Sequence, residues 1–169
     1  MEQAAVVPAG AGDELVEPAS GGGVVLRLAG SRYVIDMAAV AEVVPRTHVT
    51  RVPGTPPWLT GVANWRGRIL PVVDIRPLLG APATPLPSSA RLLVLAGDGC
   101  TVGLVAEAVP GVHRGSLEEA APAPATLAAD AATLVVGQVL DRYGPIAVLD
   151  PAAVLALRRR LDNRRRGSA

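Results

Sequence analysis

Short runs of apolar residues alternate with glycine-rich turns along most of the chain, and this pattern is typical of short β-strands. The runs are too short and too often broken by Gly or Pro to form a set of amphipathic helices. The strands expected from them span 24–28, 32–35, 41–44, 61–65, 68–73, 91–95, 101–106, 134–140 and 145–149, with a short helical turn over 36–40. The pattern therefore predicts an all-β protein.

Two proline-rich segments between the strands are expected to be loops. One covers residues 53–57 ahead of Trp58, and the other spans 120–132. After the last strand, Asp150-Pro151 places a capping acid before a proline at the first helical position, which signals the start of a helix. We therefore expect a C-terminal helix from this point to about residue 160.

The two halves of the chain resemble each other in three segments that occur in the same order. Residues 40–48 recur as 105–113, with six of nine positions identical. Residues 26–30 recur in part 67 positions later, and five residues between 61 and 79 recur 76 positions later. The chain is therefore expected to contain two copies of a five-stranded unit of about 65 residues. Strands this short, joined by tight turns, favour small barrels.

Composition narrows the classes of protein to which the chain can belong. All 16 basic residues are arginine, so chemistry that needs a lysine is excluded. Aromatic residues make up 2% of the chain and Phe is absent, so the core must be aliphatic. The single cysteine, Cys100, cannot form an internal disulfide, and the N-terminus lacks the basic region of a secretory signal. We expect a cytoplasmic protein with no segment that inserts into a membrane.

Charge is concentrated at the two ends. Residues 1–23 contain four acidic residues and no basic one among many Gly, Ala and Pro, which predicts a disordered acidic leader. Residues 158–169 contain six arginines and one acid and form a basic C-terminal tail. Such a tail could bind nucleic acid or an acidic partner, or be the solvated end of a helix. Because the body over 24–157 is neutral, we expect no nucleic-acid binding.

Signals for catalysis are weak. A hydrolase would need Ser89 or Ser116 to meet His113 and an acid, but these residues fall on unrelated predicted loops and no G-x-S-x-G turn is present. The H-E-x-x-H and C-x-x-C spacings of metal sites are also absent. The sequence therefore favours a protein that is not an enzyme and needs no metal or cofactor.

One segment resembles the signature of a known family. Residues 58–76 read W-L-T-G-V-A-N-W-R-G-R-I-L-P-V-V-D-I-R, which is similar to the G-V-x-N-x-R-G-x-x-x-P-V-x-D-L-R string of CheW-like chemotaxis adaptors. The resemblance extends over 24–157 and departs from the family at Trp65, Ile75 and Glu107, where Leu, Leu and Asp are usual. It implies a fold of two SH3-like five-stranded β-barrel subdomains, roughly 24–89 and 90–157, with short helices and a C-terminal helix.

The resemblance also implies a function. CheW-like adaptors carry no catalysis, and they bridge the cytoplasmic tip of a chemoreceptor hairpin to the regulatory domain of a histidine kinase. The chain is therefore expected to be a scaffold of a bacterial chemosensory system, cytoplasmic and associated with membrane receptor arrays, with weak self-association. The output of the pathway stays open between flagellar swimming, pilus motility and another response. In the alternative, the arginine-rich tail of an adaptor from a non-flagellar pathway also binds an acidic partner.

The resemblance can be carried to individual residues. Those expected to bind the receptor or the kinase are Val40, Glu42, Asn64, Arg66, Gly67, Arg68, Gly103 and Val105. Arg66 would project a guanidinium from a rigid turn beside its acidic partner Glu42. Gly103 and Val105 would lie where an apolar groove between the barrels receives the receptor helices. Each position also fits a purely structural role, because Arg66 can be a solvated turn residue and the valines can be core residues.

Overall fold

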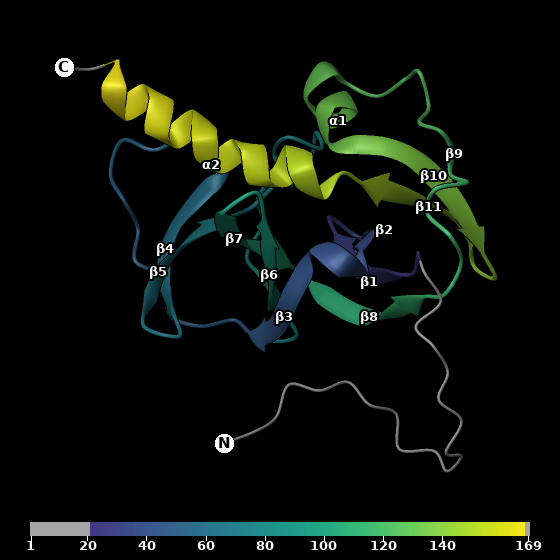
Figure 1. Cartoon of the computed structure of the whole chain (residues 1–169), viewed down its shortest axis with the longest axis horizontal. Coiled ribbons are helices and arrows are strands. Elements are labelled where there is room, and N and C mark those ends of the chain that lie inside the picture. Colours follow the sequence, from purple (N-terminus) through teal and green to yellow (C-terminus); the bar gives the residue numbers. More distant parts are fainter. Residues whose placement is uncertain (1–20, 168–169) are drawn as a thin grey trace, which may run out of the picture.

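The structure, a computed structural model, describes residues 21–167 and consists of two β-sheets with a C-terminal helix lying across them (Figure 1). The first sheet has the strand order β8 (Ala108–His113), β1 (Gly23–Leu28), β2 (Ser31–Asp36), β11 (Gly144–Leu149), β10 (Val135–Asp141) and β9 (Ala121–Pro122). The second sheet has the order β3 (Val40–Pro45), β6 (Arg91–Gly97), β7 (Cys100–Ala106), β5 (Arg68–Val73) and β4 (Leu59–Trp65). The helices are η1 (Met37–Ala39), α1 (Ala129–Leu134) and α2 (Pro151–Arg166). The all-β prediction is confirmed.

The two sheets, which we call sheet A (with β1) and sheet B (with β3), repeat one pairing order. In each, an antiparallel hairpin pairs on one side with a single strand and on the other side with a second hairpin through a parallel contact, β11 with β2 in sheet A and β5 with β7 in sheet B. The corresponding strands are those that the internal repeat makes equivalent. Among the described residues, the two edge strands of a sheet do not pair with each other, either in sheet A or in sheet B. Neither sheet therefore closes into a fully hydrogen-bonded barrel.

The sheets divide the chain differently from the sequence-based boundary near residue 89. Sheet B is built from the continuous segment 40–106, whereas sheet A combines 23–36 with 108–149. The first hairpin of each copy, β1–β2 or β6–β7, has therefore been exchanged. The β1–β2 hairpin pairs with β8 and β11 of the second copy, and the β6–β7 hairpin pairs with β3 and β5 of the first. The two copies carry the same apolar pattern. Strands can therefore bury their apolar side chains equally well by pairing within one copy or between the two copies, and the pattern alone does not predict which pairing occurs.

The core is aliphatic, as the composition requires, and it lies between the sheets and beneath α2. Leu26 and Leu28 of sheet A and Leu93 and Leu95 of sheet B are fully buried in one cluster. The buried face of α2 joins this cluster with Val154, Leu155 and Leu157. Because apolar residues from both sheets and the helix share one core, the two sheets form a single packed body.

The N-terminal boundary of the fold lies earlier than the predicted leader allows. Gly23 already pairs with Asp36 and His113 in β1, and the rest of the predicted leader, residues 1–20, lies outside the described residues. A Cβ on Gly23 would come within 2.4 Å of Val34 Cγ2 and 2.8 Å of the Ile35 carbonyl oxygen. This glycine is therefore a site of close strand packing, although the sequence placed it in the predicted disordered leader.

Two other expectations change at the C-terminal side of the chain. The predicted loop over 120–132 contains β9 and most of α1, whose residues Ala131 and Leu134 are buried. The C-terminal helix starts as predicted, because the Asp150 carboxylate accepts a hydrogen bond from the Ala152 amide at 2.9 Å. It continues to Arg166, so most of the predicted basic tail is the end of α2.

Candidate functional site

The turn between β4 and β5 projects an arginine from a rigid support. Arg66 and Gly67 both have positive φ, at 51° and 75°, which is the backbone of a type I′ hairpin turn. The Asn64 side-chain oxygen accepts a hydrogen bond from the Gly67 amide at 3.0 Å and closes the turn. The Arg66 side chain is 70% exposed. The Asn64–Gly67 turn therefore holds the Arg66 guanidinium at the surface of the protein, in the position that the resemblance implied.

Three side chains from opposite edges of sheet B meet at this turn, and we call Glu42, Trp65 and Arg66 the tip cluster. Arg66 Nη2 lies 3.0 Å from Glu42 Oε2, and the Trp65 ring nitrogen donates a hydrogen bond to the same oxygen at 2.9 Å. The Arg66 guanidinium also stacks 5.2 Å above the Trp65 ring. Glu42 lies on β3 and the arginine beside β4, so the cluster forms because sheet B curls until its two edge strands approach.

Trp65 is the member of the tip cluster whose role the sequence did not reveal. The family usually has Leu here, and a leucine can neither donate a hydrogen bond to Glu42 nor offer an aromatic face to Arg66. Ion pairs as exposed as Arg66–Glu42 contribute at most about 1 kcal/mol to stability. The arrangement therefore orients the guanidinium more than it stabilises the fold.

The other predicted binding residues divide into surface and core positions. Arg68 is exposed at the start of β5, and Val40 is half-buried at the start of β3. Gly103 and Val105 lie on β7 and are buried, with Val105 only 1% exposed. These two positions therefore expose almost no surface in the isolated chain, and their part in receptor binding stays a prediction. Val105 is buried because it packs with Ala63, Val72 and Leu92 in a small apolar cluster, and a Cβ on Gly103 would come within 3.0 Å of Leu70 Cδ2.

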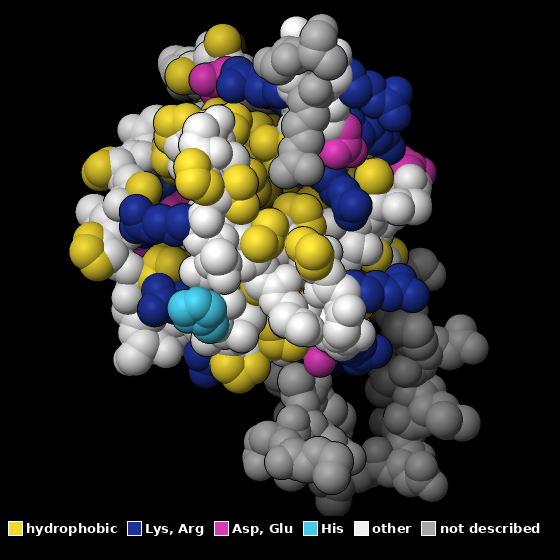
Figure 2. All heavy atoms as spheres, turned by 90° about the vertical axis from the view of Figure 1, so that its left-hand side faces the viewer, with side chains coloured by type: hydrophobic (Ala, Val, Ile, Leu, Met, Phe, Trp, Pro, Cys, Tyr) yellow, Lys and Arg dark blue, Asp and Glu magenta, His cyan; other side chains and the backbone are white. Residues whose placement is uncertain are grey.

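An open cleft of about 750 Å³ lies between α2 and the β4–β5 hairpin. Its apolar lining includes Leu59, Val62 and Ile69. Its helical wall carries Arg158, Leu161, Asp162 and Arg164. Ile69 is 77% exposed, an unusually high value for an isoleucine in a strand. Figure 2 faces this side of the molecule and shows hydrophobic side chains gathered next to arginines. The cleft therefore combines an apolar surface with a charged border of two arginines and one aspartate.

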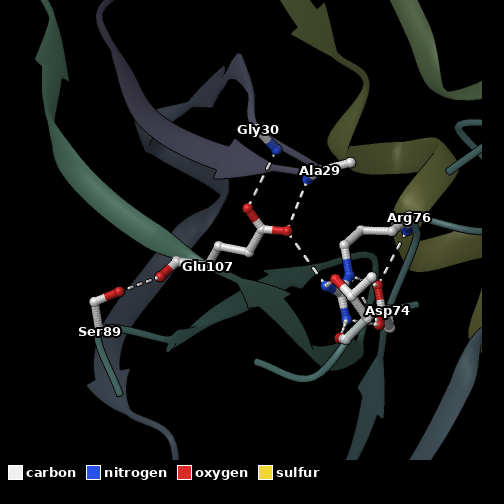
Figure 3. Close-up of polar contacts among 7 residues, drawn as sticks. Ala29, Gly30, Asp74, Arg76, Ser89 and Glu107 are labelled. Atoms are coloured by element: carbon white, nitrogen blue, oxygen red, sulfur yellow. Dashed lines mark hydrogen bonds and ion pairs between the residues drawn. The ribbon is translucent and has the colours of Figure 1, made fainter. Parts of the chain in front are cut away.

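Two further residues of the signature, Asp74 and Arg76, lie inside the protein. The Arg76 side chain is 2% exposed, and its Nε and Nη2 atoms donate to the two Asp74 carboxylate oxygens at 3.0 and 2.8 Å. Nη1 reaches Glu107 at 3.2 Å (Figure 3). Nη2 also donates to the Thr84 carbonyl at 2.9 Å. Hydrogen bonding to Asp74 raises the pKa of Arg76 further above its ordinary value. This part of the signature builds the interior.

The turn between β10 and β11 carries a second charged group, this time on sheet A. Arg32 from β2 donates to both Asp141 carboxylate oxygens at 2.5 and 3.0 Å. The guanidinium groups of Arg32 and Arg142 lie 5.3 and 4.8 Å from the Tyr143 ring centre. The hydrogen bonds from Arg32 lower the pKa of the Asp141 carboxyl below its ordinary value of 3.8.

This lowered pKa predicts how Asp141→Asn changes the pH dependence of stability. A carboxyl whose pKa is lower in the folded than in the unfolded state stabilises the fold above the unfolded-state pKa, and this contribution is lost as the pH falls through the folded-state pKa. The variant should therefore be less stable than the parent by a constant amount from pH 7 to about 5, and the gap should close on further acidification. Urea unfolding of both proteins at a series of pH values measures the difference in stability. A difference that persists unchanged into acid would contradict the lowered pKa of Asp141.

Within residues 21–167, no group of three or more His, Cys, Asp or Glu side chains is arranged to hold a metal ion. The same part of the chain contains no helix long and apolar enough to cross a bilayer.

Comparison with known proteins gives one family. The CheW-like domain profile matches residues 22–159. Protein PilI of Pseudomonas aeruginosa is 36% identical over 92 residues, which cover 54% of this chain and 52% of PilI. Chemotaxis protein CheW of Bacillus subtilis is 32% identical over 100 residues, which cover 57% of this chain and 64% of that protein. The matches thus span from about half to just under two thirds of these relatives.

A solved structure shares the fold. The scaffolding protein TtCheW from Thermoanaerobacter tengcongensis superposes with a TM-score of 0.69 at 27% sequence identity. The match covers 77% of this chain and 88% of that chain. Both sheets of the structure described above therefore belong to an architecture already seen in a scaffold protein.

Proposed function

The chain belongs to the CheW-like domain family, and on this basis we propose that it couples the cytoplasmic tip of a chemoreceptor to the regulatory domain of a CheA-type histidine kinase. Proteins of this family are non-catalytic adaptors of chemosensory systems, and one of the solved relatives is described as a scaffolding protein. The proposal places the protein in the cytoplasm beside membrane receptor arrays, where weak self-association would add to its retention.

The observation that carries the proposal is the tip cluster, with an oriented and exposed guanidinium beside an apolar cleft. An adaptor needs separate surfaces for its two partners, and the chain offers candidates for both. The edge of sheet B with Val40 and Glu42 suits the receptor, whose amphipathic helices would bury apolar side chains beside the half-buried valine. The cleft around Ile69 suits the kinase, whose regulatory domain has the same fold and would present its own hairpin ends.

Ile69→Asp tests the assignment of the cleft to the kinase. Burying a carboxylate in an apolar interface without a partner is unfavourable, so binding of the isolated kinase regulatory domain should weaken at least about tenfold. Titration calorimetry with the kinase domain measures this loss. Receptor binding should be unchanged, because the substituted side chain lies outside the β3 edge.

Leu140→Asp is the matched control for this experiment. Leu140 is 76% exposed on β10, against 77% for Ile69 on β5, but it belongs to the other sheet. Its replacement adds the same charge at the same exposure and should change kinase affinity by less than about twofold. Equal losses from both variants would show that the added charge, rather than the cleft, determines binding.

A second candidate concerns the pathway rather than the chemistry. PilI matches at 36% identity and protein FrzA of Myxococcus xanthus at 31%, beside CheW proteins at similar values. These matches favour keeping a non-flagellar output as the alternative, in which the arginines at the end of α2 could also bind an acidic partner. Restoration of motility in strains that lack either the flagellar or the pilus adaptor would decide between the two pathways.

A further inference from the structure

Glu107 occupies the point at which the chain crosses from one sheet to the other. It lies between β7, the inner strand of sheet B, and β8, the edge strand of sheet A. Its backbone amide donates to the Arg27 carbonyl at 2.9 Å, and its own carbonyl accepts from the Ser89 hydroxyl at 2.8 Å. Arg27 is part of β1 in sheet A, whereas Ser89 precedes β6 in sheet B. The backbone of Glu107 is therefore tied to both sheets.

The side chain of Glu107 enters an anion-binding turn of sheet A. Ala29 and Gly30, which connect β1 to β2, have φ values of 50° and 76°. Successive residues with positive φ in a tight turn can aim their amide hydrogens at one point and form a concave site for an anion. The Glu107 carboxylate fills it, with Oε1 accepting from Ala29 N at 2.9 Å and Oε2 from Gly30 N at 3.3 Å.

The same carboxylate is held from sheet B by Arg76. Glu107 Oε1 also accepts from Arg76 Nη1 at 3.2 Å, and Figure 3 shows the carboxylate between the Ala29–Gly30 turn and this arginine. The guanidinium cannot follow a movement of Glu107, because Asp74 and Thr84 hold its other nitrogen atoms and its side chain is 2% exposed. The Glu107 carboxylate thus connects the Ala29–Gly30 turn of sheet A to Arg76, which follows β5 of sheet B.

We propose that Glu107 is a positioning residue that fixes the orientation of sheet A relative to sheet B. The Glu107 amide also binds the Arg27 carbonyl, and Arg158 and Arg159 of α2 reach Thr101 and Asp98. Most of the remaining contact between the sheets is aliphatic packing, which is non-directional and so leaves freedom to rotate or slide. Hydrogen bonds between charged groups add direction. The equivalent glutamate of the other copy, Glu42, has the different task of orienting Arg66, so the two copies use the same residue type for distinct purposes.

The consequence for binding rests on the proposed function. A receptor that contacts both sheets would bind a pre-oriented pair of surfaces with less loss of conformational freedom than a mobile pair. Replacement of Glu107 by Gln should therefore weaken receptor binding severalfold, while the tip cluster itself stays intact.

The direct test is the distribution of distances between the sheets in the isolated protein. Spin labels on cysteines at Ile69 of β5 and at Val136 of β10, which is 56% exposed and distant from the β10–β11 turn, report this distance by double electron–electron resonance in a Cys100→Ser background. Glu107→Gln keeps the size of the side chain, but its amide nitrogen must face a donor, either in the turn or on Arg76. We expect a narrow distribution in the parent and one at least half again as wide in the variant.

Asp141→Asn is the control, because it disrupts an ion pair of similar geometry that lies within sheet A. It should lower stability without widening the distribution, which separates orientation from a general loss of stability. Glu107→Asp is a second variant if Glu107→Gln does not fold. The aspartate retains the charge but is one methylene too short to reach both Ala29 and Arg76, so this variant should also broaden the distribution.

A Glu107→Gln distribution as narrow as that of the parent would overturn the proposal, and so would equal broadening by Asp141→Asn. Neither result depends on the proposed function, because no partner is present in the measurement. Conversely, a parent protein that binds neither receptor nor kinase fragments would refute the proposed function and leave the distance measurement to decide the role of Glu107.

Discussion

Arg66→Glu is expected to leave the protein folded and to abolish kinase activation in a reconstituted mixture of receptor, kinase and adaptor. The Arg66 side chain is 70% exposed, so its replacement should change stability by less than about 0.5 kcal/mol. The new carboxylate would stand beside Glu42, whose Oε2 is now 3.0 Å from the guanidinium, and would be repelled by it. The receptor or kinase surface that binds Arg66 would then lack a directed hydrogen-bond donor on the adaptor and would face two negative charges. Its binding should weaken at least about a hundredfold.

Two further variants make this experiment specific. Arg27→Glu reverses an exposed charge on β1 of sheet A that forms no ion pair among the described residues, and it should reduce activation far less. The double variant Glu42→Arg with Arg66→Glu restores an opposite-charge pair in the reverse orientation. It should stay inactive, because the partner contacts the outer guanidinium rather than the pair as a whole. Full activation by Arg66→Glu at the concentrations used for the parent would refute the site assignment.

Arg76→Met is expected to cause the largest loss of stability. The arginine is 2% exposed and Asp74 is 6% exposed, so methionine would leave the Asp74 carboxylate buried without a cation. Removal of one partner of a buried ion pair costs about 3–5 kcal/mol, a large part of the stability of a domain of this size. Urea unfolding of the variant and the parent measures the change.

The matched control is Arg68→Met, the same substitution at an exposed arginine of β5, which should alter stability by less than about 0.5 kcal/mol. The contrast isolates burial, because the two substitutions remove the same charge and add the same side chain. An Arg76→Met variant within about 1 kcal/mol of the parent would show that Asp74 relaxes toward solvent when its partner is removed.

Much of the local structure could be predicted because it depends on short-range chemistry. Alternation of apolar residues and glycine turns identifies most strands, and Asp150 ahead of a proline marks the start of α2. The turn at Arg66-Gly67 follows from its sequence, since glycine readily adopts the positive φ required at its second position. The signature within 58–76 adds the family. Missed elements, such as α1, have weak patterns that gain their structure from packing against neighbouring elements.

The sequence by itself determined the strands, their turns, the aliphatic core and the duplicated plan, because each depends on residue type and spacing along the chain. Only the tertiary structure decided which copies exchange hairpins, and that Val105 is buried while Ile69 is exposed. It alone assigned Glu107 to the junction of the sheets, although Glu42, which the family resemblance had already placed beside Arg66, occupies the equivalent repeat position. Such contacts join residues far apart in sequence, so they depend on how the sheets curl and pack, which local patterns do not encode.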